Sequence, residues 1–368
     1  MISQKKILFL LHIPPPVHGS SIVGQNIKNS VLLNETFDCR YINLIASRKI
    51  KETGKISIIK IVRFIWVFTQ LLWELLMHRP NIGYLALTAT GAAFYKDVLL
   101  IALLRLFRIK RVYHLHNKGF SKYQSKINKI LYQFVFYDAD VVLLSKYLYP
   151  DIQEYVPESR VHICPNGIAD IVSDNKPHFL KNGDPVKILF LSNMIESKGV
   201  FVLLDACSIL KKRGASFQCV FIGGEGNVTA FQFNEKVMQI DLSDHVRYIG
   251  EKYMEEKEQV FLNADIFAFP TYYCNECFPL VLLEAMSAGM PIVSTFEGGI
   301  PDIIEDGVTG FLVPQRNAEL LADKLEVLIR NPLLREKMGR MGRKKYEEQF
   351  TLEHFEKNLI AILQKLTV

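Results

Sequence analysis

The chain has few cysteines, only two tryptophans and no long apolar run free of charge. Its six cysteines lie scattered through apolar segments, at Cys39, Cys164, Cys207, Cys219, Cys274 and Cys277. This distribution fits the reduced, buried thiols of a cytoplasmic protein. Cys274 and Cys277 have the spacing of a redox or zinc motif, but no second pair or histidine cluster accompanies them. The apolar run after Lys6 is too short for a signal-peptide core, so no secretory leader is expected.

Acidic residues are scarce in the first half of the chain. Residues 1–170 contain 22 Lys and Arg but only 11 Asp and Glu, a net charge of +11. We therefore expect attraction to an anionic surface or acceptor, such as a membrane leaflet or a lipid pyrophosphate. No known nucleic-acid-binding motif and no stripe of interleaved aromatic and basic residues is present, so nucleic acid is not an expected partner.

The most apolar segment, residues 56–77, is interrupted by Lys60, Arg63 and Glu74. These charges argue against a membrane-spanning helix. Two interpretations remain open. The segment is either a long helix packed on an N-terminal sheet, or an amphipathic helix that touches the inner face of the membrane. Trp66 and Trp73 suit the second interpretation.

The most specific pattern runs from Glu276 to Glu284, E-C-F-P-L-V-L-L-E. In an ideal helix, acids eight positions apart lie about 80° apart around the axis and about 12 Å apart along it. They would therefore contact separate parts of one elongated ligand. Pro279 suits the first turn of a helix, and a helix starting there directs N–H groups and partial positive charge at an anion. An ordinary solvated helix start is the alternative.

Two expected strands flank this stretch. Residues 264–271 read as a buried strand ending in a loop, and residues 291–295 as the next strand, followed by a glycine loop at 298–301. Together they predict a parallel β-α-β unit with its ligand loops on one edge. In this context the E-x(7)-E pattern resembles that of the retaining, nucleotide-sugar-dependent glycosyltransferases of family 4.

The resemblance implies an α/β chain of the GT-B fold, with two Rossmann-like domains whose parallel sheets face a central cleft. A length of 368 residues fits two domains. The expected parts are an acceptor domain at 1–168, a linker at 169–185, a nucleotide-sugar domain at 186–345, and a C-terminal helix at 346–368 that crosses back. Pro, Gly and polar residues crowd the linker.

In the second domain, Lys198 follows the strand expected at 186–191 and would place an ammonium on a diphosphate. A solvated surface lysine is the alternative. Related sequences often have Gly-Arg where Ser192 and Asn193 stand here, so Asn193 would donate a hydrogen bond without the positive charge. The missing arginine weakens the expectation of a phosphate clamp made of two cations.

Two further loops are assigned to the donor. Gly223 belongs to the glycine-rich exit of a strand at 219–222, a pattern that would also fit a dinucleotide site. The G-x-G-x-x-G fingerprint does not follow the strand correctly, which disfavours that reading. By resemblance, backbone near Tyr248 and Ile249 holds the base.

In the first domain, Gly19 stands in a rigid loop after the first strand. In the family this loop borders the cleft, although an ordinary strand-to-helix turn has the same pattern. Ser20 or Ser21 is expected to cap the following helix. His114 and His116 lie on one face of an extended strand. His116, nearest the loop, matches the histidine that bonds the donor sugar in the family; His114 is the second choice, and a core histidine is the alternative.

The implied reaction moves a hexose-type sugar from a nucleoside diphosphate, UDP or GDP, to a hydroxyl of a glycan or lipid-linked acceptor, with the anomeric configuration kept. Cell-surface polysaccharide synthesis is the expected setting. Glu276 would bond hydroxyls of the donor sugar and Glu284 those of the ribose. The leaving diphosphate would be stabilised by Lys198 and by the helix start at Phe278, Pro279, Leu280 and Val281.

No cofactor and no metal are expected, because no D-x-D-like pair stands in a suitable loop. Two other functions remain open. One is a nucleotide-sugar epimerase of the same fold, which would need additional acid and base groups and has no acceptor to dock. The other is a sugar-binding protein without catalytic activity.

Overall fold

The computed structural model describes residues 4–44, 58–171, 185–252 and 254–367. The chain forms two compact units, Met1–Asn166 with Leu352–Val368, and Gly167–Thr351. Each unit contains a six-stranded sheet in which all paired strands run parallel. Both sheets are covered by helices, as expected for doubly wound α/β domains.

The sheet of the first unit has the strand order β2-β1-β3-β4-β5-β6. Its strands are β1 (Lys6–Leu11), β2 (Asp38–Asn43), β3 (Ile82–Leu87), β4 (Lys110–Leu115), β5 (Asp140–Leu143) and β6 (Val161–Ile163). The central strands read as continuous apolar runs because they are buried on both faces, and every residue of β3 is buried.

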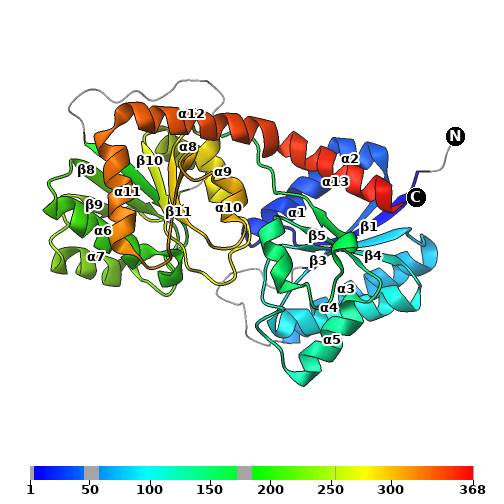
Figure 1. Cartoon of the computed structure of the whole chain (residues 1–368). Coiled ribbons are helices and arrows are strands. Elements are labelled where there is room, and N and C mark those ends of the chain that lie inside the picture. The colour runs from blue at the N-terminus through cyan, green and yellow to red at the C-terminus, as the bar shows by residue number, and fades with distance from the viewer. Residues whose placement is uncertain (1–3, 45–57, 172–184, 253, 368) are drawn as a thin grey trace. The chain divides into compact units, whose positions relative to one another are not determined.

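Helices cover both faces of this sheet. They are α1 (Gly19–Asn29), α2 (Val31–Thr36), α3 (Ile58–Met77), α4 (Gly91–Leu106), α5 (Lys126–Phe136) and α13 (Leu352–Leu366), with short 3-10 helices η2 (Lys146–Asp151) and η3 (Glu158–Arg160). Figure 1 shows α1, α2 and α13 on one face and α3, α4 and α5 on the other.

The start of α1 differs from the sequence expectation. His18 caps the helix: its Nδ1 accepts the Ser21 N–H at 3.3 Å, and the Ser21 hydroxyl accepts the His18 N–H at 2.9 Å. The expected cap by Ser20 or Ser21 was wrong, because α1 begins at Gly19, one residue after the histidine. Ser21 instead supplies the reciprocal half of a capping box.

The sheet of the second unit has the order β12-β11-β10-β7-β8-β9. Its strands are β7 (Val186–Leu191), β8 (Phe217–Ile222), β9 (Val246–Tyr248), β10 (Ile266–Phe269), β11 (Ile292–Thr295) and β12 (Gly310–Val313). The chain adds β8 and β9 on one side of β7, and then returns to place β10 on the other side. The strand order therefore reverses between β7 and β10, the point at which open α/β sheets bind ligands.

The helices of this unit are α6 (Val200–Lys212), α7 (Ala230–Gln239), α8 (Met254–Leu262), α9 (Leu280–Ser287), α10 (Ile300–Ile303), α11 (Ala318–Arg330) and α12 (Pro332–Gln349), preceded by the 3-10 helix η4 (Glu196–Lys198). Helix α6 packs against α11, and α9 packs against α12. The two helices α6 and α9 start at the reversal point, because they follow β7 and β10.

The chain passes between the units at two places. Ile168 forms a parallel bridge with Thr351, and its N–H donates to the Phe350 carbonyl at 3.0 Å. The segment expected as a linker, 169–185, lies mostly outside the described residues. The helix expected at 346–368 is split: Tyr346 belongs to α12 and the second unit, and α13 begins at Leu352.

A polar cluster fixes the entering segment within the second unit. Arg343 donates to both carboxylate oxygens of Asp170, with an Nη1–Oδ1 distance of 2.7 Å. Ser287 also donates to Asp170, at 2.8 Å. The hydrogen bond to Asp170 raises the pKa of Arg343, so the pair stays ionised.

Candidate active site

Lys198 and Glu276 meet at the reversal point of the second sheet. Lys198 ends η4 after β7, and Glu276 lies in the loop after β10, the neighbouring strand. The Lys198 ammonium donates to Glu276 Oε2. Their side chains are only 15% and 10% exposed, so the pair is largely withdrawn from water. Because both charges are withdrawn from water, removing either partner would leave the other charge buried and uncompensated.

The backbone next to Lys198 is tightly fitted. Gly199 has φ +94°, and a Cβ there would lie 2.3 Å from the Pro270 carbonyl oxygen. The Tyr272 N–H also donates to the Ser197 carbonyl at 2.8 Å. The loop carrying Lys198 is thus bonded directly to the loop carrying Glu276.

Two aromatic side chains complete the surroundings of the ammonium. Lys198 Nζ lies 4.5 Å from the Tyr273 ring centroid and 5.6 Å from that of Phe269. Both rings favour the cation electrostatically. Sequence reasoning missed Tyr273, although its place three residues before Glu276 was a usable signal.

The stretch Phe278, Pro279, Leu280 and Val281 forms the entry to α9. The helix begins at Leu280, and Pro279 is the extended residue before it, with φ −68° and ψ 117°. Pro279 was expected inside the first turn and lies one position earlier. No side chain caps this end of the helix within the described chain. The N–H groups of the first turn are suited to an anion.

Glu284 lies in the second turn of α9 and is paired on one side only. Its Oε1 accepts a bond from Lys257 at 2.6 Å, while its Oε2 is buried without a hydrogen-bond partner among the described residues. Burial raises the pKa of Glu284, and Lys257 partly opposes this. A buried carboxylate oxygen without a donor is costly, and a hydroxyl of a ligand would satisfy it.

Lys257 on α8 was not predicted from the sequence. It stands in a charged segment, M-E-E-K-E-Q, which has the composition of a solvated helix face. Only its contact with Glu284, 27 residues away, distinguishes it.

The other predicted residues of this unit lie at the carboxyl ends of β7, β8 and β9. Asn193 is exposed just after β7. Gly223 has φ +144°, and a Cβ there would lie 1.8 Å from the Ser192 carbonyl oxygen, so the loops after β7 and β8 touch. Tyr248 donates to the Gly223 carbonyl at 2.7 Å, and Ile249 is 41% exposed.

The two predicted residues of the first unit lie at the carboxyl edge of its own sheet. Gly19 is exposed, and a Cβ there would meet nothing within 4 Å, so no contact of the described chain requires a glycine. His116 follows β4 directly, and its ring centroid lies 4.1 Å from that of His114. Burial lowers the pKa of His116 well below its ordinary value, and the nearby His114, His12 and His18 lower it further.

His114, the second choice, is a core residue. It is fully buried and shares a hydrogen bond between its Nδ1 and the Tyr84 hydroxyl. Its Nε2 has no partner among the described residues. Sequence reasoning missed His12, which directly follows β1, and His18, which caps α1 just before Gly19.

The remaining sequence motif, Cys274 and Cys277, joins no ligand cluster. Cys274 is exposed and Cys277 buried. Across residues 4–44, 58–171, 185–252 and 254–367, no group of three or more His, Cys, Asp or Glu side chains is placed to hold a metal ion.

Comparison with known families identifies the second unit. Residues 172–345 match the model of the family glycosyl transferases, group 1. The chain carries a domain of this family. The amylovoran biosynthesis glycosyltransferase AmsK of Erwinia amylovora is 34% identical to this chain over 186 residues, which make up 50% of this chain and 45% of AmsK.

A second relative matches over a similar length. The putative colanic acid biosynthesis glycosyltransferase WcaL of Salmonella typhimurium is 30% identical over 190 residues, 50% of this chain and 46% of WcaL. The matched region thus spans about half the length of either relative.

Solved structures show the fold of the whole chain. The Anabaena protein Alr3699/HepE in complex with UDP superposes with a TM-score of 0.75 at 17% identity, covering 98% of this chain and 100% of that one. Together with the two parallel sheets, this likeness confirms the GT-B class of two Rossmann-like domains. In this chain, the residues that match the group 1 family lie in the second unit. That the two sheets face each other across a cleft stays a prediction.

Proposed function

We propose that the protein is a retaining, metal-independent glycosyltransferase. It moves a hexose-type sugar from a nucleoside diphosphate to a hydroxyl of a glycan or lipid-linked acceptor, in the synthesis of a cell-surface polysaccharide. The group 1 domain supports the transfer reaction, and the names of AmsK and WcaL support polysaccharide synthesis as its setting. A lipid-linked acceptor would bring the chain to an anionic membrane surface.

One observation carries this proposal. The Lys198–Glu276 pair, the uncapped start of α9 and the half-satisfied Glu284 occur together at the reversal point of one sheet. They offer, in order, a cation for phosphate, N–H donors for an anion, and an acceptor for hydroxyls. A nucleoside diphosphate sugar presents all three complementary groups.

The ion pair has a specific consequence for binding. A diphosphate would take over the Lys198 ammonium, and sugar hydroxyls would donate to Glu276, so both charges exchange one partner for another. During bond cleavage, negative charge grows on the leaving diphosphate, and Lys198 with the first turn of α9 would stabilise it. UDP is the favoured leaving group, because the structural neighbour Alr3699/HepE was solved with UDP.

The test is a thermal-shift panel of UDP, GDP, ADP, CMP and NAD, each with and without EDTA. A ligand that binds only the folded state raises its stability by mass action. We expect a shift with UDP or GDP that survives EDTA. Glu284→Ala should weaken this binding by about 1 to 3 kcal/mol, the range of a lost hydrogen bond to a charged group. Glu235→Ala, at an exposed position on α7, is the matched control.

Reaction products then separate the remaining functions. Incubation with the UDP-sugar that shifts the melting temperature most, and with a saccharide acceptor, should give a product of retained anomeric configuration by NMR. Formation of an isomeric nucleotide sugar without acceptor would indicate the epimerase. Nucleotide binding with no turnover would indicate a binding protein, and a response to NAD alone would contradict the donor site.

A further inference from the structure

Helix α3 carries apolar side chains on its exposed side as well as on its packed side. Val67, Leu71 and Leu75 are its buried residues. Around the rest of the helix lies a stripe of large apolar side chains, each 55% to 80% exposed. We call this stripe the α3 face, and it consists of Ile58, Val62, Ile65, Trp66, Trp73 and Met77. A surface helix of a water-exposed domain normally carries polar residues there.

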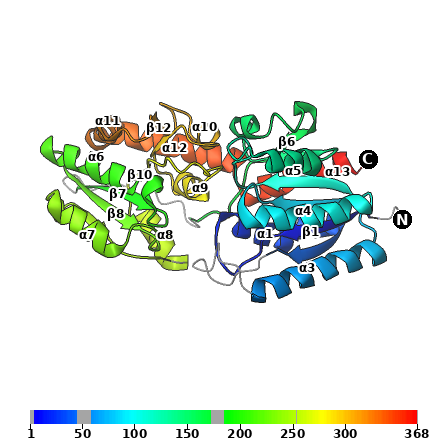
Figure 2. The same cartoon turned by 90° about the horizontal axis from the view of Figure 1, so that it is seen from below.

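The α3 face lies at the border of the first unit. Figure 2 shows α3 with the sheet and α4 on one side of it. Helix α3 itself packs mainly against α4 and β2. An exposed apolar patch of this kind marks an interaction site.

Helix α3 does not have the character of a membrane span. Lys60, Arg63 and Glu74 interrupt it, and no helix within the described ranges is both long and apolar enough to cross a bilayer. An apolar helix with charges along it is instead suited to lie in the plane of a membrane surface.

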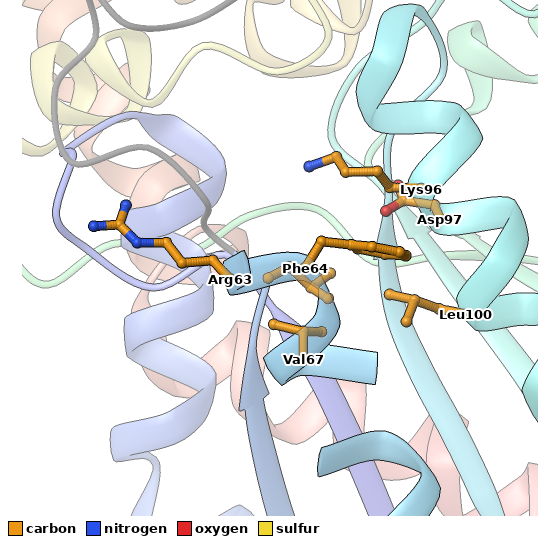
Figure 3. A pocket seen from close by; sticks show the side chains of 7 residues that line it. Arg63, Phe64, Val67, Lys96, Asp97 and Leu100 are labelled. Carbon is orange, nitrogen blue, oxygen red and sulfur yellow. The ribbon is translucent and has the colours of Figure 1, made fainter. Parts of the chain in front are cut away.

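Positive charge stands beside the α3 face. Arg63 and Lys96 border a shallow hollow between α3 and α4, and Phe64, Val67 and Leu100 form its apolar lining (Figure 3). Asp97 also lines it, but this carboxylate is buried and accepts the Thr88 N–H at 2.9 Å. Basic side chains at the edge of an apolar hollow are complementary to a lipid, whose phosphate is anionic and whose acyl chain is apolar.

We propose that the α3 face docks on the surface of an anionic lipid bilayer. Its apolar side chains enter the boundary between headgroups and acyl chains, with the two tryptophans at the depth that such rings favour. Arg63 and Lys96 meet lipid phosphates, and the surplus of 22 basic over 11 acidic residues in positions 1–170 attracts the unit to the membrane. The docking does not depend on the transfer reaction.

The chain carries its own probe for this contact. Trp66 and Trp73 are its only two tryptophans, and both belong to the α3 face. Vesicles made of equal amounts of phosphatidylcholine and phosphatidylglycerol should shift the tryptophan emission to the blue. Brominated acyl chains in these vesicles should quench that emission. Pure phosphatidylcholine should give at least tenfold weaker binding. Added salt should weaken binding to the anionic vesicles, because it shortens the Debye length.

Matched variants locate the contact. The double variant Ile58→Ser and Ile65→Ser removes two exposed side chains from the face, and should reduce vesicle binding at least tenfold while leaving the melting temperature unchanged. Phe231→Ser with Leu333→Ser is the control, because these side chains are 76% and 78% exposed in the second unit. Arg63→Gln with Lys96→Gln should reduce the salt dependence.

Three results would overturn the proposal. They are unchanged tryptophan emission on anionic vesicles, equal loss of binding in the control variant, and a blue shift that grows with protein concentration without lipid. The last result would assign the α3 face to a second copy of the chain. None of them changes the nucleotide-induced thermal shift, so failure of this proposal is distinguishable from failure of the proposed transfer.

Discussion

At the scale of single residues, buried polar atoms without partners are the most informative feature of both units. Glu284 Oε2 in the second unit and His114 Nε2 in the first are buried, and neither has a hydrogen-bond partner in the described chain. Such atoms destabilise the folded state by about 1 to 3 kcal/mol each. In Glu284 this cost fits a ligand site, because the other oxygen is held by Lys257.

The buried histidines of the first unit predict a loss of stability in acid. Burial lowers the pKa of His114 to about 3 and that of His12 to about 4, from 6.5. Above pH 6.5 both are neutral in the folded and the unfolded chain. As the pH falls below 6.5 the unfolded chain takes up protons first, so each histidine should cost about 1.4 kcal/mol per pH unit until its folded pKa is reached.

Urea unfolding between pH 7.5 and pH 4.5 measures this slope. His114→Gln should flatten it, because the variant removes one of the two buried histidines. An unchanged slope in His114→Gln would show that the acid sensitivity arises elsewhere.

At the scale of elements, loops that follow parallel strands bring the candidate site together. The sequence predicted the strand, loop and helix around Glu276, because apolar runs and the E-x(7)-E spacing are local signals. It did not predict that Lys198 would bond Glu276, 78 residues away. That contact depends on β7 lying beside β10, which is a property of strand order.

Two other residues were missed for different reasons. His18 was missed as a helix cap because Ser20 and Ser21 fit the usual cap residues better. Lys257 was missed because a charged helix face looks solvated until its partner is known.

Gly199 predicts how closely the two site loops must fit. Gly199→Ala forces an alanine into φ +94° and places its Cβ 2.3 Å from the Pro270 carbonyl oxygen. Gly250→Ala is the matched control, with φ +75° and nothing within 4 Å. The control should lose about 1 to 2 kcal/mol of unfolding free energy from left-handed strain alone, and Gly199→Ala should lose more. Equal losses in urea unfolding would show that the loops can separate.

At the scale of the whole molecule, the second unit is held together where the chain enters and leaves it. Arg343 donates two hydrogen bonds to Asp170, and both side chains are partly exposed, at 21% and 37%. This pair ties the entering segment to α12, the helix through which the chain leaves.

A double-mutant cycle on Asp170→Ala and Arg343→Ala should give a coupling energy of about 1 kcal/mol. A bidentate ion pair contributes more to stability than an ordinary surface ion pair. The exposed pair Lys344–Glu348, 3.8 Å apart on the same helix, should give almost none. A coupling energy as small as that of the control pair would mean that the Asp170–Arg343 pair does not stabilise the segment by which the chain enters the second unit.

The bridge between Ile168 and Thr351 also affects how readily the second unit could be replaced during evolution. Both ends of the second unit lie side by side, so Gly167–Thr351 is topologically an insert between Asn166 and α13. Adjacent ends are the usual condition under which a domain tolerates excision or grafting. The part that carries Lys198, Glu276 and Glu284 is therefore suited to replacement as one piece. Under the proposed function, such a replacement would change the sugar donor while the α3 face and its unit stay unaltered.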